Sequence, residues 1–154
     1  MHTSTRASAQ STCTVRTPQL RDYKKMADLT GQLGYECTEE VVLARLGEMQ
    51  DSSQYAVYVA ELPGGQVAGW VGIYVFRSVA TGSFAEISGL VVDQMVRSRG
   101  IGKMLLEAAE GWTRSLGFDD LSVRSNVKRA RAHRFYKRNG YEHVKTQEEF
   151  RKIL

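Results

Sequence analysis

The residues best suited to chemistry form a glycine-containing loop, Arg97–Lys103 (RSRGIGK), between a β-rich stretch and a strongly periodic helical stretch. Gly100 and Gly102 allow backbone angles that a side chain would forbid, so successive N–H groups can point into one concavity. A helix that starts here adds its unpaired amides and the positive end of its dipole. Three cationic side chains stand in the same loop: Arg97, Arg99 and Lys103. The pattern predicts a phosphate-binding cradle.

Two common nucleotide-binding motifs do not fit this loop. A Walker loop needs four residues between its glycines and a Ser or Thr after the Lys, whereas one residue separates the glycines here and Met104 follows Lys103. A dinucleotide fingerprint needs a third glycine at the place of Leu105. The structural alternative is a helix start softened by glycine and surrounded by surface arginines.

A second motif lies near the end of the chain, where His133–Tyr141 (HRFYKRNGY) reads as a helix ending in an aromatic–Tyr pair, followed by Gly and an aromatic residue. This motif and the loop, which fits Gln/Arg-x-x-Gly-x-Gly/Ala, together resemble the GNAT superfamily of acetyl-coenzyme A-dependent N-acetyltransferases. The resemblance covers the chain from about Val15 to Leu154. It implies acetyl-CoA as the acyl donor, direct attack by an amine in a ternary complex, and a homodimer as a common state.

The resemblance also assigns residues to the coenzyme. The backbone of Leu90, Val91 and Val92 would pair with the pantetheine arm as a short added strand does, and Asn126 would hydrogen-bond near that arm. One departure is that Arg129 stands where many members carry an Asn, seven residues before the motif's Tyr. The loop residues would bind the pyrophosphate: Arg97, Ser98, Arg99, Gly100, Ile101, Gly102 and Lys103.

Two residues are candidates for proton transfer, since an attacking alkyl amine must lose a proton and a departing thiolate must gain one. Glu86 lies in an apolar strand and stands where members resembling histone acetyltransferases carry a catalytic glutamate. The alternative for Glu86 is an edge carboxylate that faces solvent or pairs with Arg77. Tyr136 corresponds to the family tyrosine that points at the coenzyme sulfur, and its alternative is a core aromatic packed with Phe135.

The elements that must position these residues follow from periodicity and turn signals. Thr38 is expected to cap the second of two early helices, and Gly117 and Asn139-Gly140 to stop two later ones. The order reads as a strand near Val15, two helices, three antiparallel strands, then helix, strand, helix and two strands. The expected strands are residues 54–61, 67–76, 83–93, 121–124, 141–145 and 150–154; the expected helices are residues 20–33, about 39–49, 101–116 and 128–138.

These elements predict an α/β fold with a mixed, mostly antiparallel central sheet of six to seven strands, flanked by about four helices. The resemblance gives it the GNAT-like acyl-CoA N-acyltransferase topology. Residues 1–13 are Ser/Thr-rich and lack hydrophobic periodicity, so we expect a disordered tail before a single domain over residues 14–154.

Composition excludes several classes. The 154 residues are 42% hydrophobic and contain two cysteines without metal-ligand spacing, so a disulfide scaffold and a metal site are not expected. The longest apolar run is strand length, so no membrane association is expected. Cysteine usage suits a cytoplasmic protein.

Charge is unevenly distributed along the chain. Residues 1–93 hold 7 Lys/Arg against 10 Asp/Glu, whereas residues 94–154 hold 14 against 7. An acidic stretch around the second helix would attract a cationic amine, and a solvated helix face explains it equally well. The function that fits is N-acetyl transfer from acetyl-CoA to a primary amine. The alternatives are transfer of another acyl group and, from a different class, a basic nucleic-acid-binding module; coenzyme phosphates explain the basic half better.

Overall fold

The protein is described by a computed structural model that covers residues 13–154. Most of the predicted tail, residues 1–13, lies outside the described residues; Cys13 directly precedes the first strand. The described residues divide into two compact units, one that ends at Ser122 and one that spans Val123–Leu154. That residues 14–154 form one domain stays a prediction, and each unit is described by itself.

The sheet has the strand order β1-β2-β3-β4-β5. β1 (Thr14–Arg16) pairs with β2 (Tyr55–Glu61), β2 with β3 (Val67–Ser78), and β3 with β4 (Gly82–Val92), all antiparallel. β5 (Leu121–Val123) begins at the end of the first unit. The register of β4 against β3 shifts at Gly72/Ile73, a bulge that moves the later part of β4 by one residue. The mixed α/β class is confirmed.

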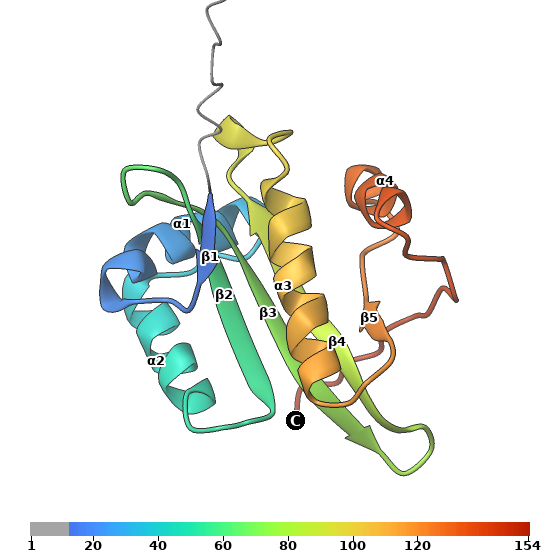
Figure 1. Cartoon of the computed structure of the whole chain (residues 1–154). Helices are drawn as coiled ribbons and strands as arrows, with labels where there is room; N and C mark the ends of the chain where they lie inside the picture. Colours follow the sequence, from blue (N-terminus) through green and yellow to red (C-terminus); the bar gives the residue numbers. More distant parts are fainter. Residues whose placement is uncertain (1–12) are drawn as a thin grey trace, which may run out of the picture. The chain divides into compact units, whose positions relative to one another are not determined.

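Helices cover both faces of this sheet (Figure 1). A short 3-10 turn, η1 (Leu20–Asp22), leads into α1 (Tyr23–Leu33), and α2 (Glu39–Met49) follows. As expected, Thr38 caps α2 by accepting a hydrogen bond from the Val41 amide at 3.3 Å. α3 (Ile101–Ser115) crosses in front of the sheet in Figure 1, after a second 3-10 turn, η2 (Gln94–Val96).

The alternation of side chains along β3 assigns residues to the two faces. A Cβ at Gly69 would lie 3.0 Å from Leu105 of α3, so Gly69, Val71 and Ile73 face α3. Trp70 faces the other way and packs on a cluster that contains Tyr23, Met26 and Leu29 of α1. Both faces of β3 are therefore covered by helices. Because a shift by one residue would exchange the faces, this burial fixes the register of β4 and the face on which each of its side chains lies.

The second unit contains α4 (Ala130–Arg138), which ends at Asn139 and a left-handed Gly140 with φ of +90°. The Tyr141 amide donates to the Tyr136 carbonyl at 2.9 Å, the helix-ending hydrogen bond that such a glycine permits. This stop was predicted from Asn139-Gly140.

The strands predicted over residues 141–145 and 150–154 are not present, so the described sheet has five strands instead of six to seven. Val144, Phe150 and Ile153 are 86%, 88% and 92% exposed. A strand needs a partner for its backbone hydrogen bonds and a buried face to hold its register. β-rich composition alone supplies neither.

Candidate active site

The predicted phosphate loop follows directly from the last residue of β4 through Asp93. This carboxylate is 6% exposed and accepts hydrogen bonds from Lys25 Nζ at 2.6 Å and from the Met95 amide at 3.1 Å. The Asp93 amide donates to the Ala68 carbonyl of β3 at 2.7 Å. The hydrogen bond from Lys25, aided by the Met95 amide, lowers the pKa of Asp93. Asp93 therefore anchors the start of the loop to both α1 and the sheet.

Sequence reasoning missed Asp93 as a positioning residue. The available signal was an acidic residue placed immediately after a strand and before the glycine loop.

The loop backbone turns through two left-handed residues. Ser98 has φ of +69° and Gly100 has φ of +77°. Among the described residues, Ser98 is the only one other than glycine with a positive φ. A side chain in that region costs of order 1–3 kcal/mol, a strain found at ligand-binding segments. Because the residues on either side of Arg99 reverse the backbone direction, consecutive N–H groups can converge, as in an anion-binding nest.

Gly102 corrects the sequence expectation. It lies within α3 and is not among the glycines with positive φ, so its backbone does not need the freedom that only glycine has. Gly100 does need it, since it is the N-cap residue directly before α3 and lies in the left-handed region. Among the described residues, no side chain caps this helix start. The first amides of α3 are thus available for an anion.

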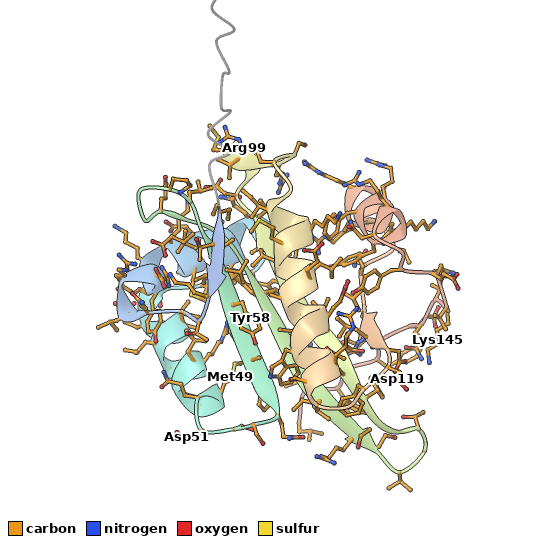
Figure 2. All side chains as sticks on the ribbon, in the orientation of Figure 1. Met49, Asp51, Tyr58, Arg99, Asp119 and Lys145 are labelled. Carbon is orange, nitrogen blue, oxygen red and sulfur yellow. The ribbon has the colours of Figure 1, made fainter. Side chains whose placement is uncertain are left out.

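The cationic side chains of the loop differ in exposure. Arg99 and Lys103 are exposed, and Figure 2 shows Arg99 at the tip of the loop. Arg97 is half-buried, and its Nε donates to the Val92 carbonyl at 3.4 Å. Arg97 therefore stabilises the turn out of β4, whereas Arg99 and Lys103 present their charge to solvent.

Leu90–Val92 form the end of β4 that leads to the loop. Along one edge of β4, they pair with Val71, Trp70 and Gly69 of β3. On the opposite side of β4, Ser122 contacts the earlier residues Ala85 and Glu86. The contact of β5 thus falls on the first half of β4, away from Leu90–Val92.

Glu86 is buried in β4 at 6% exposure, opposite Tyr74 of β3. The Tyr74 hydroxyl donates to Glu86 Oε1 at 2.6 Å, and Ser122 Oγ lies 3.2 Å from Oε2. The solvent-facing alternative for Glu86 is therefore wrong. Arg77 hydrogen-bonds to Gln54 at 2.8 Å and to Ser83 at 3.3 Å.

A hollow of about 350 Å³ lies on the first unit between the end of α2 and β2. None of its ten lining residues is charged, and Tyr23, Tyr55 and Tyr58 form part of its wall. Met49 and Tyr58, labelled in Figure 2, come from α2 and β2. Burial raises the pKa of Tyr58. Another hollow, of about 360 Å³, lies near Arg21 and Lys25. Both acidic and basic side chains line it, and none of its lining residues is a predicted site residue.

In the second unit, Tyr136 is held between two aromatic rings of its own unit. Its ring meets those of Phe135 and Tyr141 edge-on at centroid distances of 5.2 and 5.7 Å. Burial raises the pKa of Tyr136 although the charge of Arg129 opposes this, so the hydroxyl keeps its proton at neutral pH. A protonated phenol can act as a hydrogen-bond or proton donor.

Asn126 shapes the turn before α4. Its side-chain oxygen, Oδ1, accepts a hydrogen bond from the Lys128 amide at 2.9 Å. Its main-chain carbonyl accepts from the Arg129 amide at 3.0 Å and lies 2.9 Å from His133 Nε2. The side-chain oxygen thus stabilises the local turn, and the carboxamide nitrogen is the group that could donate a hydrogen bond to a ligand.

With this geometry in view, comparison with known proteins identifies the class. The sequence model of the Acetyltransferase (GNAT) family matches residues 24–141. The chain therefore belongs to the Acetyltransferase (GNAT) family.

Two curated relatives match parts of the chain. An uncharacterised N-acetyltransferase of Bacillus subtilis, YhdJ, is 42% identical over 59 residues, which are 38% of this chain and 42% of that protein. An aminoalkylphosphonate N-acetyltransferase of Salmonella typhimurium is 36% identical over 85 residues, 54% of this chain and 55% of the relative. The matches thus span about half the length of these relatives.

Solved structures share the fold over nearly the whole chain. The aminoglycoside N-acetyltransferase AAC(6')-Iy in complex with CoA superposes with a TM-score of 0.82 at 18% identity, covering 94% of this chain and 97% of that one. Glucosamine-6-phosphate N-acetyltransferase from Arabidopsis thaliana gives 0.78 at 22% identity, covering 91% and 98%. At these identities the likeness concerns the fold. Within residues 13–154, no helix combines the length and apolar character needed to cross a bilayer.

Proposed function

We propose that the protein is an N-acetyltransferase that moves an acetyl group from acetyl-CoA to a primary amine by direct attack in a ternary complex. The observation that carries this proposal is the loop after β4. Left-handed Ser98 and Gly100, the uncapped start of α3 in the described chain and exposed Arg99 form an anion-binding segment.

The residues present fit the coenzyme. A pyrophosphate needs converging amides and positive charge, and the segment from Ser98 to Lys103 offers both. A CoA complex of a protein with this fold adds support. The backbone of Leu90, Val91 and Val92 would receive the pantetheine arm, on the part of β4 beyond the Ser122 contact. Asn126 would donate to the arm through its carboxamide nitrogen.

Acetyl-CoA supplies a thioester whose carbonyl carbon an amine nitrogen can attack, so that a C–N bond forms and the C–S bond breaks. The chain must then remove a proton from the amine and return one to the thiolate. Glu86 is the acceptor of the amine proton, and Tyr136 donates to the departing sulfur. Holding both substrates in one complex supplies much of the rate, because it makes the attack effectively intramolecular.

The acceptor belongs to the amines. One relative is named for an aminoalkylphosphonate and a structural neighbour for an aminoglycoside. The acidic side chains of α2 and its surroundings would attract a cationic amine: Glu36, Glu39, Glu40, Glu48 and Asp51. A cytoplasmic location and a homodimer stay predictions from the sequence.

A screen for thiol release with acetyl-CoA across amine classes tests this proposal. We expect release only when an amine is present, with one thiol per acetylated product, and a smaller rate with longer acyl donors. Competition with desulfo-CoA separates this function from the nucleic-acid alternative. Desulfo-CoA should occupy the loop and inhibit, and a DNA oligomer of equal charge should not. Binding of the oligomer without any amine-dependent thiol release would contradict the proposal.

A further inference from the structure

The three residues that follow β4 have all of their backbone amides hydrogen-bonded within the protein. The Asp93 amide donates to the Ala68 carbonyl of β3 at 2.7 Å, and the Met95 amide donates to Asp93 Oδ1 at 3.1 Å. The amide between them, that of Gln94, donates at 2.9 Å to Oε1 of Gln32, a residue of α1. A side chain of α1 thus supplies the acceptor that neither the sheet nor the segment itself provides.

The amides at the start of α3 differ from those of this base. No described residue accepts a hydrogen bond from the amides of Gly100–Lys103, and Met104 is the first to donate, to the Gly100 carbonyl at 3.1 Å. Amides that bind a pyrophosphate must already converge when the ligand arrives, because otherwise part of the binding free energy is lost in ordering them. The base begins five residues before left-handed Ser98, so its contacts constrain where these amides point.

Gln32 contacts the base with both ends of one carboxamide. Its Oε1 accepts from the Gln94 amide, and its Nε2 donates to Asp93 Oδ1 at 3.4 Å. The reverse orientation would set the oxygen against a carboxylate and the nitrogen against an N–H group, so the two partners define how the carboxamide lies. Lys25, seven residues earlier on α1, donates to the other oxygen of Asp93 at 2.6 Å. Two side chains of α1 therefore hold two consecutive residues at the base of the loop.

We propose that Gln32 is a positioning residue for the coenzyme, which holds the base of the loop so that the amides of Gly100–Lys103 converge on the pyrophosphate. This inference rests on the proposed function. Gln32 acts through Gln94 and Asp93, and Gln94 is exposed, so water can replace the acceptor when Gln32 is changed and the fold should survive. The expected consequence is weaker binding of the coenzyme, with an unchanged rate once the complex has formed.

Gln32→Met tests this role. Methionine has nearly the length of glutamine and suits a helix, but it cannot donate to Asp93 and is a weak acceptor for the Gln94 amide. By isothermal titration calorimetry, the variant should bind coenzyme A about fivefold more weakly, the usual effect of one hydrogen bond. In steady-state kinetics the KM for acetyl-CoA should rise by a similar factor, while kcat at saturating acetyl-CoA stays within about twofold of the wild type.

Gln94→Ala is the matched control. It removes an exposed glutamine side chain from the base of the loop and keeps the backbone amide that donates to Gln32. Its affinity for coenzyme A should therefore match that of the wild type.

A second acyl donor separates the loop from the rest of the site. S-acetylpantetheine carries the thioester and the arm but no phosphate, so the loop amides have no pyrophosphate to bind. With an amine accepted in the thiol-release screen, Gln32→Met should lose about fivefold in kcat/KM with acetyl-CoA and should match the wild type with S-acetylpantetheine.

Unchanged affinity of Gln32→Met for coenzyme A, an equal loss in Gln94→Ala, or an equal kinetic loss with both donors would overturn the positioning role and leave the acetyltransferase proposal standing. A fall in kcat together with a melting temperature lowered by more than about 4 °C would also overturn it, because both would indicate a role in the fold. Absence of transfer to any amine by the wild type would overturn the proposed function, and the calorimetric comparison would still decide the role of Gln32.

Discussion

β4 carries a buried carboxylate near its middle and another just past its end, and the two have different partners. Asp93 contacts an ammonium and a backbone amide, groups that donate and hold their protons. Glu86 contacts the hydroxyls of Tyr74 and Ser122, groups that both donate and accept. Glu86 and Asp93 are equally buried, at 6% exposure, but their hydrogen-bond partners differ in kind. We infer that the Asp93 end fixes the shape of the coenzyme loop and that the Glu86 end handles protons.

The largest expected effect comes from Gly102→Val at the coenzyme end. Valine is tolerated in a helix better than glycine, so α3 should persist, but its branched side chain would obstruct amides at the helix start. Loss of two phosphate hydrogen bonds at about 1.5 kcal/mol each corresponds to about 100-fold weaker binding of coenzyme A. Isothermal titration calorimetry measures this.

Gly111→Val on the same helix is the control, because a Cβ at Gly111 meets nothing within 4 Å. It should bind coenzyme A as the wild type does. Equal affinity of the Gly102→Val variant would show that the loop is a helix start and not a cradle.

Tyr136→Phe should lower kcat by about 10²-fold, the worth of a general acid, and leave the affinity for coenzyme A nearly unchanged. The ring would still pack against Phe135 and Tyr141. A free thiol has a pKa of about 8.5, so a poorer leaving group depends more on the donor. The defect should therefore shrink with an acyl donor that has a better leaving group. Full kcat in the variant would reduce Tyr136 to a packing role.

Glu86→Gln should lower kcat/KM for an alkyl amine at pH 7 by about 10- to 100-fold, because the amide can accept the Tyr74 hydroxyl but cannot take up a proton. The loss should ease at high pH, where the amine needs no base. Coenzyme A affinity should not change. A variant that bound coenzyme A poorly while keeping a wild-type pH profile would reverse the roles assigned to the two ends of β4.

Asp93→Asn should weaken coenzyme A binding by about tenfold, or about 1.4 kcal/mol. The amide can still accept from Met95, but the ion pair with Lys25 is lost and the loop is less well anchored. Turnover at saturating coenzyme should remain close to that of the wild type. An unchanged dissociation constant would mean that the loop holds its conformation without this anchor.

The smallest effect concerns acid stability. Hydrogen bonds from Arg16 and the Gln19 amide outweigh burial and lower the pKa of Asp22, and Lys25 lowers that of Asp93. A depressed folded-state pKa gives stability that is present above the unfolded value of about 3.9 and is lost as the pH falls below it. Urea unfolding should therefore show a constant free energy from pH 7 to about 5 and a decline below about 4.

Asp22→Asn should flatten that decline and lower the plateau by about 1–3 kcal/mol, the worth of hydrogen bonds to a charged group. A decline with unchanged slope would mean that other carboxylates control acid unfolding.

Local signals predicted much of the fold. The Thr38 cap, the period of α3 and the glycine stops at Gly117 and Gly140 depend on neighbours in sequence, and the structure has each of them. The C-terminal strands failed because a strand exists only with a partner, which composition cannot supply. The sequence also could not tell which loop glycine is left-handed, since Gly100 and Gly102 differ only in their position relative to the start of α3.

The candidate site was predictable where it follows a motif and not where it depends on register. Glu86 was found as an acid within an apolar strand. Its contact with Tyr74 depends on the pairing of β3 with β4, in which Tyr74 and Glu86 are register partners. Its contact with Ser122 joins residues 36 positions apart. No sequence period encodes such contacts, so the hydroxyl network became visible only in the structure.

Acetyl transfer itself is the most direct test of the account. The full-length protein is incubated with acetyl-CoA labelled in the acetyl group and with butylamine, and both products are followed by mass spectrometry and thiol release. The account predicts that the label appears in N-acetylbutylamine with one free thiol for each labelled amide, and that Gly102→Val lowers both signals about 100-fold when acetyl-CoA is kept below the wild-type dissociation constant. Thiol release without labelled amide, or undiminished labelled amide in Gly102→Val under these conditions, would contradict it.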